Sequence, residues 1–189
     1  MKNTFKKMSL LIAAAGLATS AGTMAAPAIS YNYVGLQFVD QDLDDPDCGQ
    51  DGLRLNGSLE LNDDFFVKGY VSDVSGNRGC GSEALALGLG YQTLFGADSS
   101  IYGAVSFERV SPDGPWDSDT GLIAEVGLRG FINNDLEARV GVSHHTAFDG
   151  NTVLGGGISY YFAPQFSVTA DVGLGSETSE IAAGVRYNF

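Results

Sequence analysis

Ser143, His144 and His145 are consecutive, and Asp149 follows four residues later. Serine, histidine and an acid are the parts of a hydrolytic triad, in which the histidine activates the serine hydroxyl. The segment contains neither an Asp-x-His pair nor a His-x-Ser motif. We therefore predict two histidines at a strand end without a catalytic role and no enzyme, with a hydrolase at the rim as a distant alternative.

Four acids stand at relative positions 1, 3, 5 and 12 of one segment, as Asp40, Asp42, Asp44 and Asp51. This spacing imitates a calcium-binding EF-hand loop. However, position 6 is Asp45 where the motif has glycine, position 12 is Asp instead of Glu, and no helical pattern flanks the segment. We predict a solvated acidic loop with no metal or cofactor, and a calcium site is the weaker alternative.

Cys48 and Cys80 are the two cysteines of the chain. They lie in connections that flank one predicted hairpin, so the thiols could meet, and an exported chain permits their oxidation. A bridge would close a loop of about 30 residues and add about 3 to 4 kcal/mol in the chain-entropy model. We predict a disulfide, and two free thiols are the alternative.

Ten charged residues alternate with apolar residues along the chain. In a closed sheet whose apolar side faces outward, all of them would point inward. They are Arg54, Glu60, Lys68, Glu108, Glu125, Arg129, Glu137, Arg139, Asp171 and Arg186. Five are basic and five are acidic, so their charges have no sign bias. We predict salt bridges that plug the interior, and hydrated gaps that leave a narrow pore are the alternative.

Strands must position these side chains, because the chain shows alternation in place of a sustained helical period. Leucine occupies positions 53, 55, 59 and 61, and the positions between them carry Arg54, Asn56, Ser58 and Glu60. The same alternation recurs in the segments 85–92, 122–129, 136–143, 166–174 and 181–189. Each such segment predicts a strand with one apolar and one polar face.

Short polar turns and longer connections alternate between these strands. The turns are at 62–64, 96–99, 133–135 and 163–165, and the longer connections are at about 40–52, 73–83, 110–120, 146–152 and 175–180. Four hairpins that begin near 53, 84, 121 and 153, with one further strand at each end (29–39 and 180–189), give ten strands. We predict an all-β, antiparallel up-and-down transmembrane barrel of ten strands, with eight as the alternative.

A soluble sandwich would also alternate, so strand length and the position of the charges decide between the two folds. Strands of about 10 residues are longer than the 5 to 6 usual in soluble proteins. Aromatic residues cluster near the short turns, as an interfacial belt would, at Phe65, Tyr91, Phe95, Tyr160, Phe162, Phe166, Tyr187 and Phe189. Both observations favour the membrane barrel.

The chain has 189 residues, 23 acidic against 10 basic side chains, a net charge of −13 and 26 glycines. This balance makes nucleic acid an improbable partner, because phosphate binding requires clustered Lys and Arg. Residues 1–25 combine a basic start, a short apolar stretch and a tail of small residues, which is the layout of a secretory signal peptide. We predict Sec-dependent export, cleavage after Ala25 and a mature barrel domain at 26–189.

The hairpin Ala124–Arg129, the opening Ser30–Val34 and the ending Val185-Arg186-Tyr187-Asn188-Phe189 resemble the small outer-membrane β-barrel proteins of Gram-negative bacteria, the group related to OmpA and OmpX. The resemblance implies an outer-membrane location, contact with lipid and lipopolysaccharide, and a monomer. It also implies periplasmic chaperones and a C-terminal signal for the barrel-assembly machinery, formed by Val185, Tyr187 and Phe189. OmpA and OmpX relatives have eight strands, whereas this chain predicts ten.

The function that follows is that of a structural or surface-interaction barrel with a plugged, charge-paired lumen. A narrow porin-like channel for ions or small solutes is the alternative.

Overall fold

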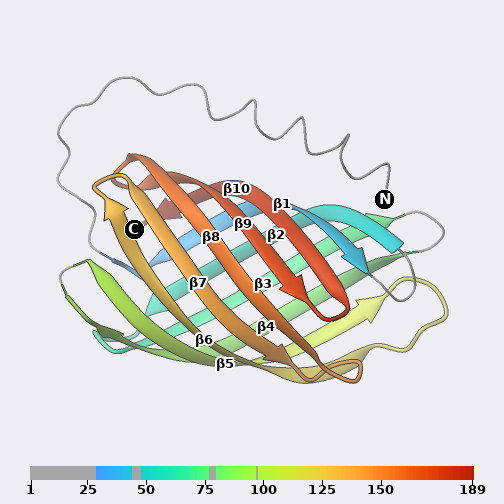
Figure 1. Ribbon diagram of the computed structural model, residues 1–189. Coiled ribbons are helices and arrows are strands. Elements are labelled where there is room, and N and C mark those ends of the chain that lie inside the picture. The colour runs from blue at the N-terminus through green and yellow to red at the C-terminus, as the bar shows by residue number, and fades with distance from the viewer. Residues whose placement is uncertain (1–28, 44–47, 77–79, 97) are drawn as a thin grey trace.

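The computed structural model describes residues 29–43, 48–76, 80–96 and 98–189. They form a closed barrel in which each strand pairs with its sequence neighbours and β1 pairs with β10 (Figure 1). The strands are β1 (Tyr33–Leu43), β2 (Cys48–Glu60), β3 (Phe65–Gly76), β4 (Gly81–Leu94), β5 (Ser99–Pro112), β6 (Asp119–Asn133), β7 (Leu136–His145), β8 (Asn151–Ala163), β9 (Phe166–Gly175) and β10 (Thr178–Asn188). The ten-stranded up-and-down barrel is confirmed, and the eight-stranded alternative is wrong.

Alternation along each strand separates the two faces of the sheet. On β2, Leu53, Leu55 and Leu59 are exposed on the outside, while Ser58 is buried inside. The antiparallel register pairs apolar residues with apolar residues, for example Leu36 with Leu55 across β1 and β2. Because side chains on paired residues share a face, the apolar set stays outside around the whole barrel.

Large apolar side chains cover the outer surface, and almost every strand contributes some that are exposed. An apolar surface of this extent would be a severe aggregation hazard in water, so it requires lipid. Near the short turns, Phe65 packs on Tyr91, and Phe166 packs on both Phe162 and Tyr187. No helix in the described part of the chain is long and apolar enough to cross a membrane.

The barrel has two different ends. The turns that follow β2, β4, β6 and β8 lie at the end that also carries the C-terminus, on the left in Figure 1, and we call this the turn end. The opposite end, which carries the connections 113–118, 146–150 and 176–177, is the loop end. Glu137 lies at the turn end of β7, and His145 lies at its loop end.

The long connections predicted between the strands are shorter in the structure. The segment 40–52, for example, is strand up to Leu43 and again from Cys48, so four residues join β1 to β2. Asp40 pairs with Asp51 across these strands, and Asp73 pairs with Glu83 across β3 and β4. Polar residues thus continue the hydrogen-bonded ladder beyond the apolar band, because backbone pairing does not require apolar side chains.

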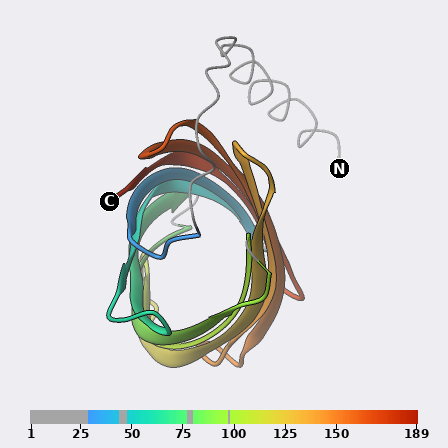
Figure 2. The same ribbon diagram turned by 90° about the vertical axis from the view of Figure 1, so that its left-hand side faces the viewer.

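The first predicted strand, 29–39, is displaced: β1 starts at Tyr33 and reaches Leu43. Residues 29–32 pass inside the barrel wall at the turn end, where Figure 2 shows the blue start of the described chain within the ring of strands. Buried Tyr31 forms a small apolar cluster there with Phe66 and Ala104. A second cluster of Val39, Val74 and Ala182 lies nearer the loop end. The predicted signal peptide lies outside the described residues.

Candidate functional site

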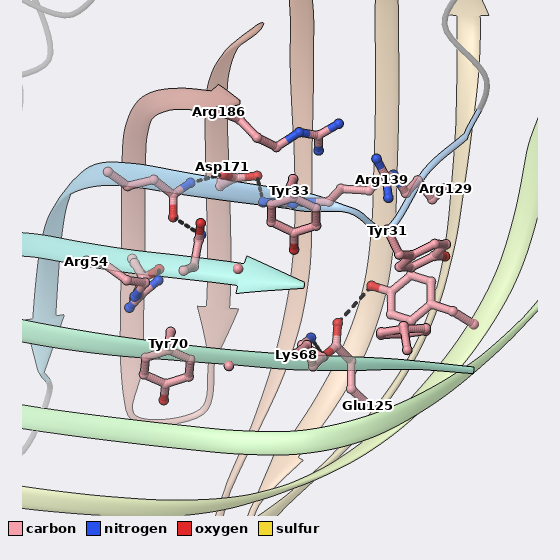
Figure 3. Close-up of a pocket in the computed structure, with 17 residues that line it drawn as sticks. Tyr31, Tyr33, Arg54, Lys68, Tyr70, Glu125, Arg129, Arg139, Asp171 and Arg186 are labelled. Atoms are coloured by element: carbon pink, nitrogen blue, oxygen red, sulfur yellow. Dashed lines mark hydrogen bonds and ion pairs between the residues drawn. The ribbon is translucent and has the colours of Figure 1, made fainter. Parts of the chain in front are cut away.

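The lumen contains a cavity of about 240 Å³. Polar, charged and tyrosine side chains from several strands surround it, and Figure 3 shows them pointing into one space. Its wall includes all five basic residues predicted to face inward and three carboxylates, namely Arg54, Lys68, Arg129, Arg139, Arg186, Glu125, Asp171 and Glu180. The cavity wall therefore carries more cations than anions, because the carboxylates of Glu60, Glu108 and Glu137 lie elsewhere in the lumen.

Three ion pairs cross the lumen at the cavity. Arg54 makes a two-pronged pair with Glu180, with Nη1–Oε1 and Nη2–Oε2 distances of 2.6 Å. Lys68 Nζ donates to Glu125, and Arg139 Nη2 donates to Asp171. Lys68 and Arg139 remain the most exposed of the five cations, at 27% and 31% of the side chain. These two cations are thus the most accessible to a solute in the lumen.

Neutral donors complete the carboxylates of the cavity. Tyr102 Oη donates to Glu125 Oε1 at 2.8 Å, on the oxygen that Lys68 does not use. Gln37 Nε2 donates to Asp171 Oδ2 at 2.6 Å. Both oxygens of Glu125 and both oxygens of Asp171 therefore already accept a hydrogen bond.

A denser cluster fills the turn end beside the cavity. Glu137, which is 1% exposed, accepts from Arg129 Nε and Nη2 at 2.8 Å, and from Arg186 Nη2 at 3.0 Å. Tyr161 Oη donates to Glu137 Oε2 at 2.8 Å, and Arg186 bonds the same phenol. Arg186 also lies over the ring of Tyr33, 4.9 Å from its centroid. One carboxylate thus holds two guanidinium groups with little access to water.

The segment before β1 is fixed in the lumen by both backbone and side-chain contacts. Glu60 accepts from the Tyr31 backbone N–H at 2.7 Å and from Asn32 Nδ2 at 2.8 Å. Arg129 Nη1 donates to the Ser30 carbonyl oxygen at 2.8 Å. The Tyr31 ring stacks on Phe66 with centroids 4.3 Å apart. Glu60, predicted as part of the lumen charge network, therefore holds the N-terminal segment instead of pairing with a cation.

Sequence reasoning missed several residues of the site, among them Tyr31 and Glu180. Both had a usable signal, which is their parity. Tyr31 alternates in step with Tyr33 and Gln37, and Glu180 alternates in step with Arg186. Glu180 is the first residue of the predicted strand 180–189 and is therefore assigned to a loop, whereas Tyr31 lies within the predicted strand 29–39 but is not a charged residue.

At the loop end, Ser143 Oγ lies 3.3 Å from His145 Nε2, and His145 Nδ1 lies 3.0 Å from Glu108 Oε2. Ser143, His145 and Glu108 therefore form a chain in the order of a hydrolytic triad. The carboxylate of Glu108 is buried. His144 instead contacts Thr152 at 2.9 Å on the outside, and Asp149 lies in the 146–150 connection with φ of 67°. The cavity wall includes neither Ser143, His145 nor Glu108.

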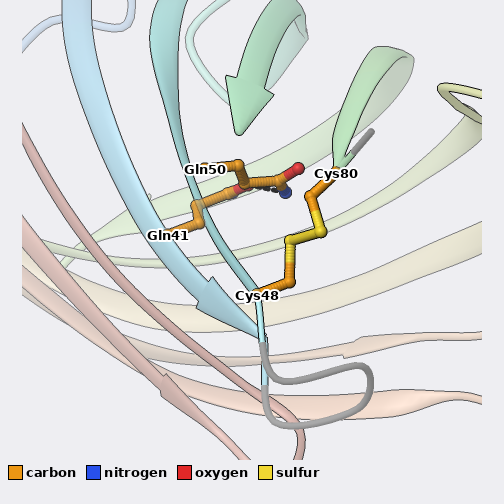
Figure 4. Close-up of a disulfide and its surroundings, with 4 residues drawn as sticks. All are labelled: Gln41, Cys48, Gln50 and Cys80. Atoms are coloured by element: carbon orange, nitrogen blue, oxygen red, sulfur yellow. Dashed lines mark hydrogen bonds between the residues drawn. A yellow bond between two sulfur atoms is a disulfide. The ribbon is translucent and has the colours of Figure 1, made fainter. Parts of the chain in front are cut away.

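The disulfide Cys48–Cys80 is confirmed, with Cα atoms 6.3 Å apart (Figure 4). It spans the loop end of β3, between the starts of β2 and β4. Gly76 ends β3 beneath it, and a Cβ at this position would lie 2.7 Å from the Cys80 carbonyl oxygen. The glycine allows the bridge to pass close to the strand.

The described part of the acidic segment is strand. Asp40, Asp42 and Asp51 lie on β1 and β2, and Asp44 lies outside the described residues. The described part of the chain contains no group of three or more His, Cys, Asp or Glu side chains that could hold a metal ion.

The three residues predicted as an assembly signal lie on the outer face. Val185, Tyr187 and Phe189 are 54%, 42% and 60% exposed. Tyr187 packs on Phe166 and Phe189 within the aromatic belt.

No protein-family model matches the chain, and no curated protein matches it. Solved structures do share its fold. An outer membrane channel from Pseudomonas putida F1 aligns with a TM-score of 0.55 and 10% identity, covering 90% of this chain and all of that one. A KdgM porin in complex with disordered oligogalacturonate aligns with a TM-score of 0.52 and 12% identity, covering 83% of this chain and 99% of that one.

A NanC porin aligns with a TM-score of 0.50 and 8% identity, covering 82% of this chain and all of that one. At these identities the likeness concerns the fold alone. The fold is therefore that of outer-membrane β-barrel proteins. Membership of the OmpA and OmpX group stays a prediction.

Proposed function

We propose that the protein is a narrow outer-membrane channel for ions or small hydrophilic solutes. The observation that carries this proposal is the cavity of about 240 Å³, which the charged side chains leave open inside the barrel. A void of this size with so many polar partners has room for several water molecules. A fully plugged scaffold would instead bring its side chains together at close-packed density.

The similar solved structures support a channel more than a purely structural barrel. Their descriptions name two porins and an outer membrane channel, and one of the porins was solved with an oligogalacturonate. The ten-stranded barrel is only slightly wider than the eight-stranded barrels whose side chains just fill the interior. We therefore expect a small conductance and passage of small solutes only.

Single-channel recording of the refolded protein in a planar bilayer tests this proposal. We expect small, stepwise conductance. Tyr31→Ala removes a ring that stacks on Phe66 beside the cavity, so the variant should conduct more than the wild type. Silence of both proteins, after a heat-modifiable gel shift has shown that they are folded, would support the plugged scaffold and contradict the channel.

Location and biogenesis belong to the same proposal. We propose that residues 1–25 direct export through the Sec pathway and are removed, and that the turn end faces the periplasm, as short turns do in bacterial barrels. Lipid and lipopolysaccharide then surround a monomer. Periplasmic chaperones act during biogenesis, and the barrel-assembly machinery reads the signal formed by Val185, Tyr187 and Phe189. Deletion of Phe189 should slow assembly in cells, whereas Phe162→Ala, elsewhere in the aromatic belt, should not.

A hydrolase is the second candidate, because Ser143, His145 and Glu108 lie in triad order. Acyl transfer also needs donors for the oxyanion, which are commonly backbone N–H groups. Ser143 lies in the ladder between Glu125 and Val153, where the backbone donors of the wall serve strand pairing. We expect no ester turnover by the wild type or by Ser143→Ala. Turnover by the wild type that disappears in Ser143→Ala would establish the hydrolase.

A further inference from the structure

We propose that the lumen cavity is a binding site for small carboxylate anions, with Lys68 and Arg139 as the groups that contact the ligand. The proposal deepens the channel function and rests on the cavity being open to solutes. Three independent features of the cavity support it: the balance of its charges, the number of its free donors and the fixed positions of its arginines.

The first feature is charge. Five cations and three carboxylates line the cavity. The carboxylate of Glu137, which pairs with both Arg129 and Arg186, offsets only one of their two positive charges and is not part of the wall. A wall with excess positive charge in a low-dielectric barrel concentrates anions in the lumen.

The second feature is the count of donors and acceptors. Both oxygens of each lining carboxylate already accept a hydrogen bond. An ammonium group has three N–H donors and a guanidinium has five, whereas Lys68 and Arg139 each make one bond to a carboxylate among the described residues. The cavity therefore offers spare N–H donors to an anion, whereas each lining carboxylate is already paired with a cation.

The third feature is preorganisation. Arg54 lies over Tyr70 at 5.3 Å from the ring centroid, and Arg129 lies over Tyr31 at 4.9 Å. Stacked guanidinium groups lose little freedom when an anion arrives, so their charge is in place before binding. The Nε atoms of Arg54 and Arg186 are buried and have no partner within the described structure. These unmatched donors further favour negative charge in the lumen.

A carboxylate suits this wall better than a neutral solute. The two oxygens of a carboxylate lie in one plane and can accept hydrogen bonds from the guanidinium group of Arg139, while the ammonium group of Lys68 adds a point charge. Neutral hydroxyl groups would accept hydrogen bonds from the same donors but without the attraction between opposite charges. Hydrogen bonds with one charged partner are weaker than those between two charged partners. The site should thus discriminate by charge among solutes of one size.

Isothermal titration of the refolded full-length protein in detergent tests the site, with glucuronate as the probe and glucose as the uncharged match. We expect glucuronate to bind and glucose not to bind. Lys68→Met and Arg139→Gln should each weaken glucuronate binding about tenfold, the loss typical of one charge-assisted hydrogen bond. Arg109→Gln is the matched control: it removes one positive charge at the loop end, where Arg109 contacts Ser118, and should leave binding unchanged.

Equal binding of glucose, absence of glucuronate binding, or an equal loss in the Arg109 variant would overturn the proposal. Reversal potentials across a salt gradient give a second readout, and we expect anion preference that declines in the Lys68 and Arg139 variants. A barrel that conducts but does not bind would remove this inference and keep the channel. A barrel that binds but is silent in the bilayer would keep the site and remove the channel.

Discussion

The turn end of the lumen and the cavity beside it contain the same kinds of charged groups in different arrangements. At the turn end, Glu137 is 1% exposed and accepts bonds from Arg129, Arg186 and Tyr161. In the cavity, Arg139 makes a single bond to Asp171, and its side chain is 31% exposed. Charge alone therefore does not decide what an ion pair does in this barrel.

Burial and the number of partners decide between the two roles. A charge buried among several partners cannot be exposed or exchanged without leaving the others unpaired, so it acts as packing. A charge that is about a third exposed and has one ionic partner, such as Arg139, costs little to rearrange, so it can bind a solute. The comparison assigns stability to the turn end and ligand contact to the cavity, and each assignment can be tested.

The largest effect is expected from Glu137→Gln. The variant leaves the guanidinium groups of Arg129 and Arg186 in a buried setting without their anion, and we expect a loss of about 3–5 kcal/mol in the free energy of unfolding. Urea unfolding in lipid vesicles, followed by gel shift, measures it. Arg139→Gln removes one cation, 31% exposed, from the cavity and should cost about 1 kcal/mol. Equal losses in the two variants would break the comparison.

A covalent constraint at the loop end is expected to matter less than Glu137. Replacement of both Cys48 and Cys80 by serine releases a bridge between residues 32 apart in sequence. In the chain-entropy model this costs about 3 to 4 kcal/mol, through greater freedom of the unfolded chain. The unfolding free energy should fall while glucuronate binding stays intact, because the bridge is not part of the cavity wall. Loss of binding at unchanged stability would contradict this separation.

Two glycines of the barrel test how tightly the turn end is packed. A Cβ at Gly90 would overlap the ring of Phe66, which stacks on Tyr31 at the turn end. We expect Gly90→Ala to cost about 1–3 kcal/mol in unfolding free energy, as overpacking does. Gly155 is the control, because the nearest atom to its Cβ would be 3.8 Å away. A Gly155→Ala variant as unstable as Gly90→Ala would show that the lumen is packed evenly.

The fold could be predicted from local patterns because each strand carries its own signal. Alternation at 53–61 fixes which face of β2 is apolar, and polar turns fix the hairpins. Loop lengths could not be predicted in this way. Asp40 and Asp51 pair across two strands, and nothing in an acidic segment distinguishes a strand beyond the membrane from a loop.

The sequence predicted which charged residues face the lumen better than it predicted which of them form ion pairs. Parity indicates which side of the wall a charge faces, but a partner is set by strand tilt and side-chain length across the lumen. Arg54 bonds Glu180, which is 126 residues away in sequence, and Glu60 bonds the Tyr31 backbone instead of a cation. Such pairings depend on how the barrel closes, so no local pattern of the sequence contains them.

The smallest expected effect concerns a carboxylate outside the lumen, Asp119 at the loop end of β6, which marks the limit of the comparison. Its oxygens accept from the backbone N–H of Phe148 at 2.7 Å and of Thr120 at 2.8 Å, and these bonds lower the pKa of the carboxyl group. A lowered pKa contributes stability above the unfolded value of about 3.9, which is lost as pH falls through the folded value. The amide proton shift of Phe148 should therefore titrate with a midpoint below about 3.9, and Asp119→Asn should abolish the titration while unfolding at pH 7 changes little. A midpoint at or above the ordinary value would mean that amide donors alone do not hold the charge, and that a carboxylate in this barrel needs a cation beside it, as Glu137 and Asp171 have.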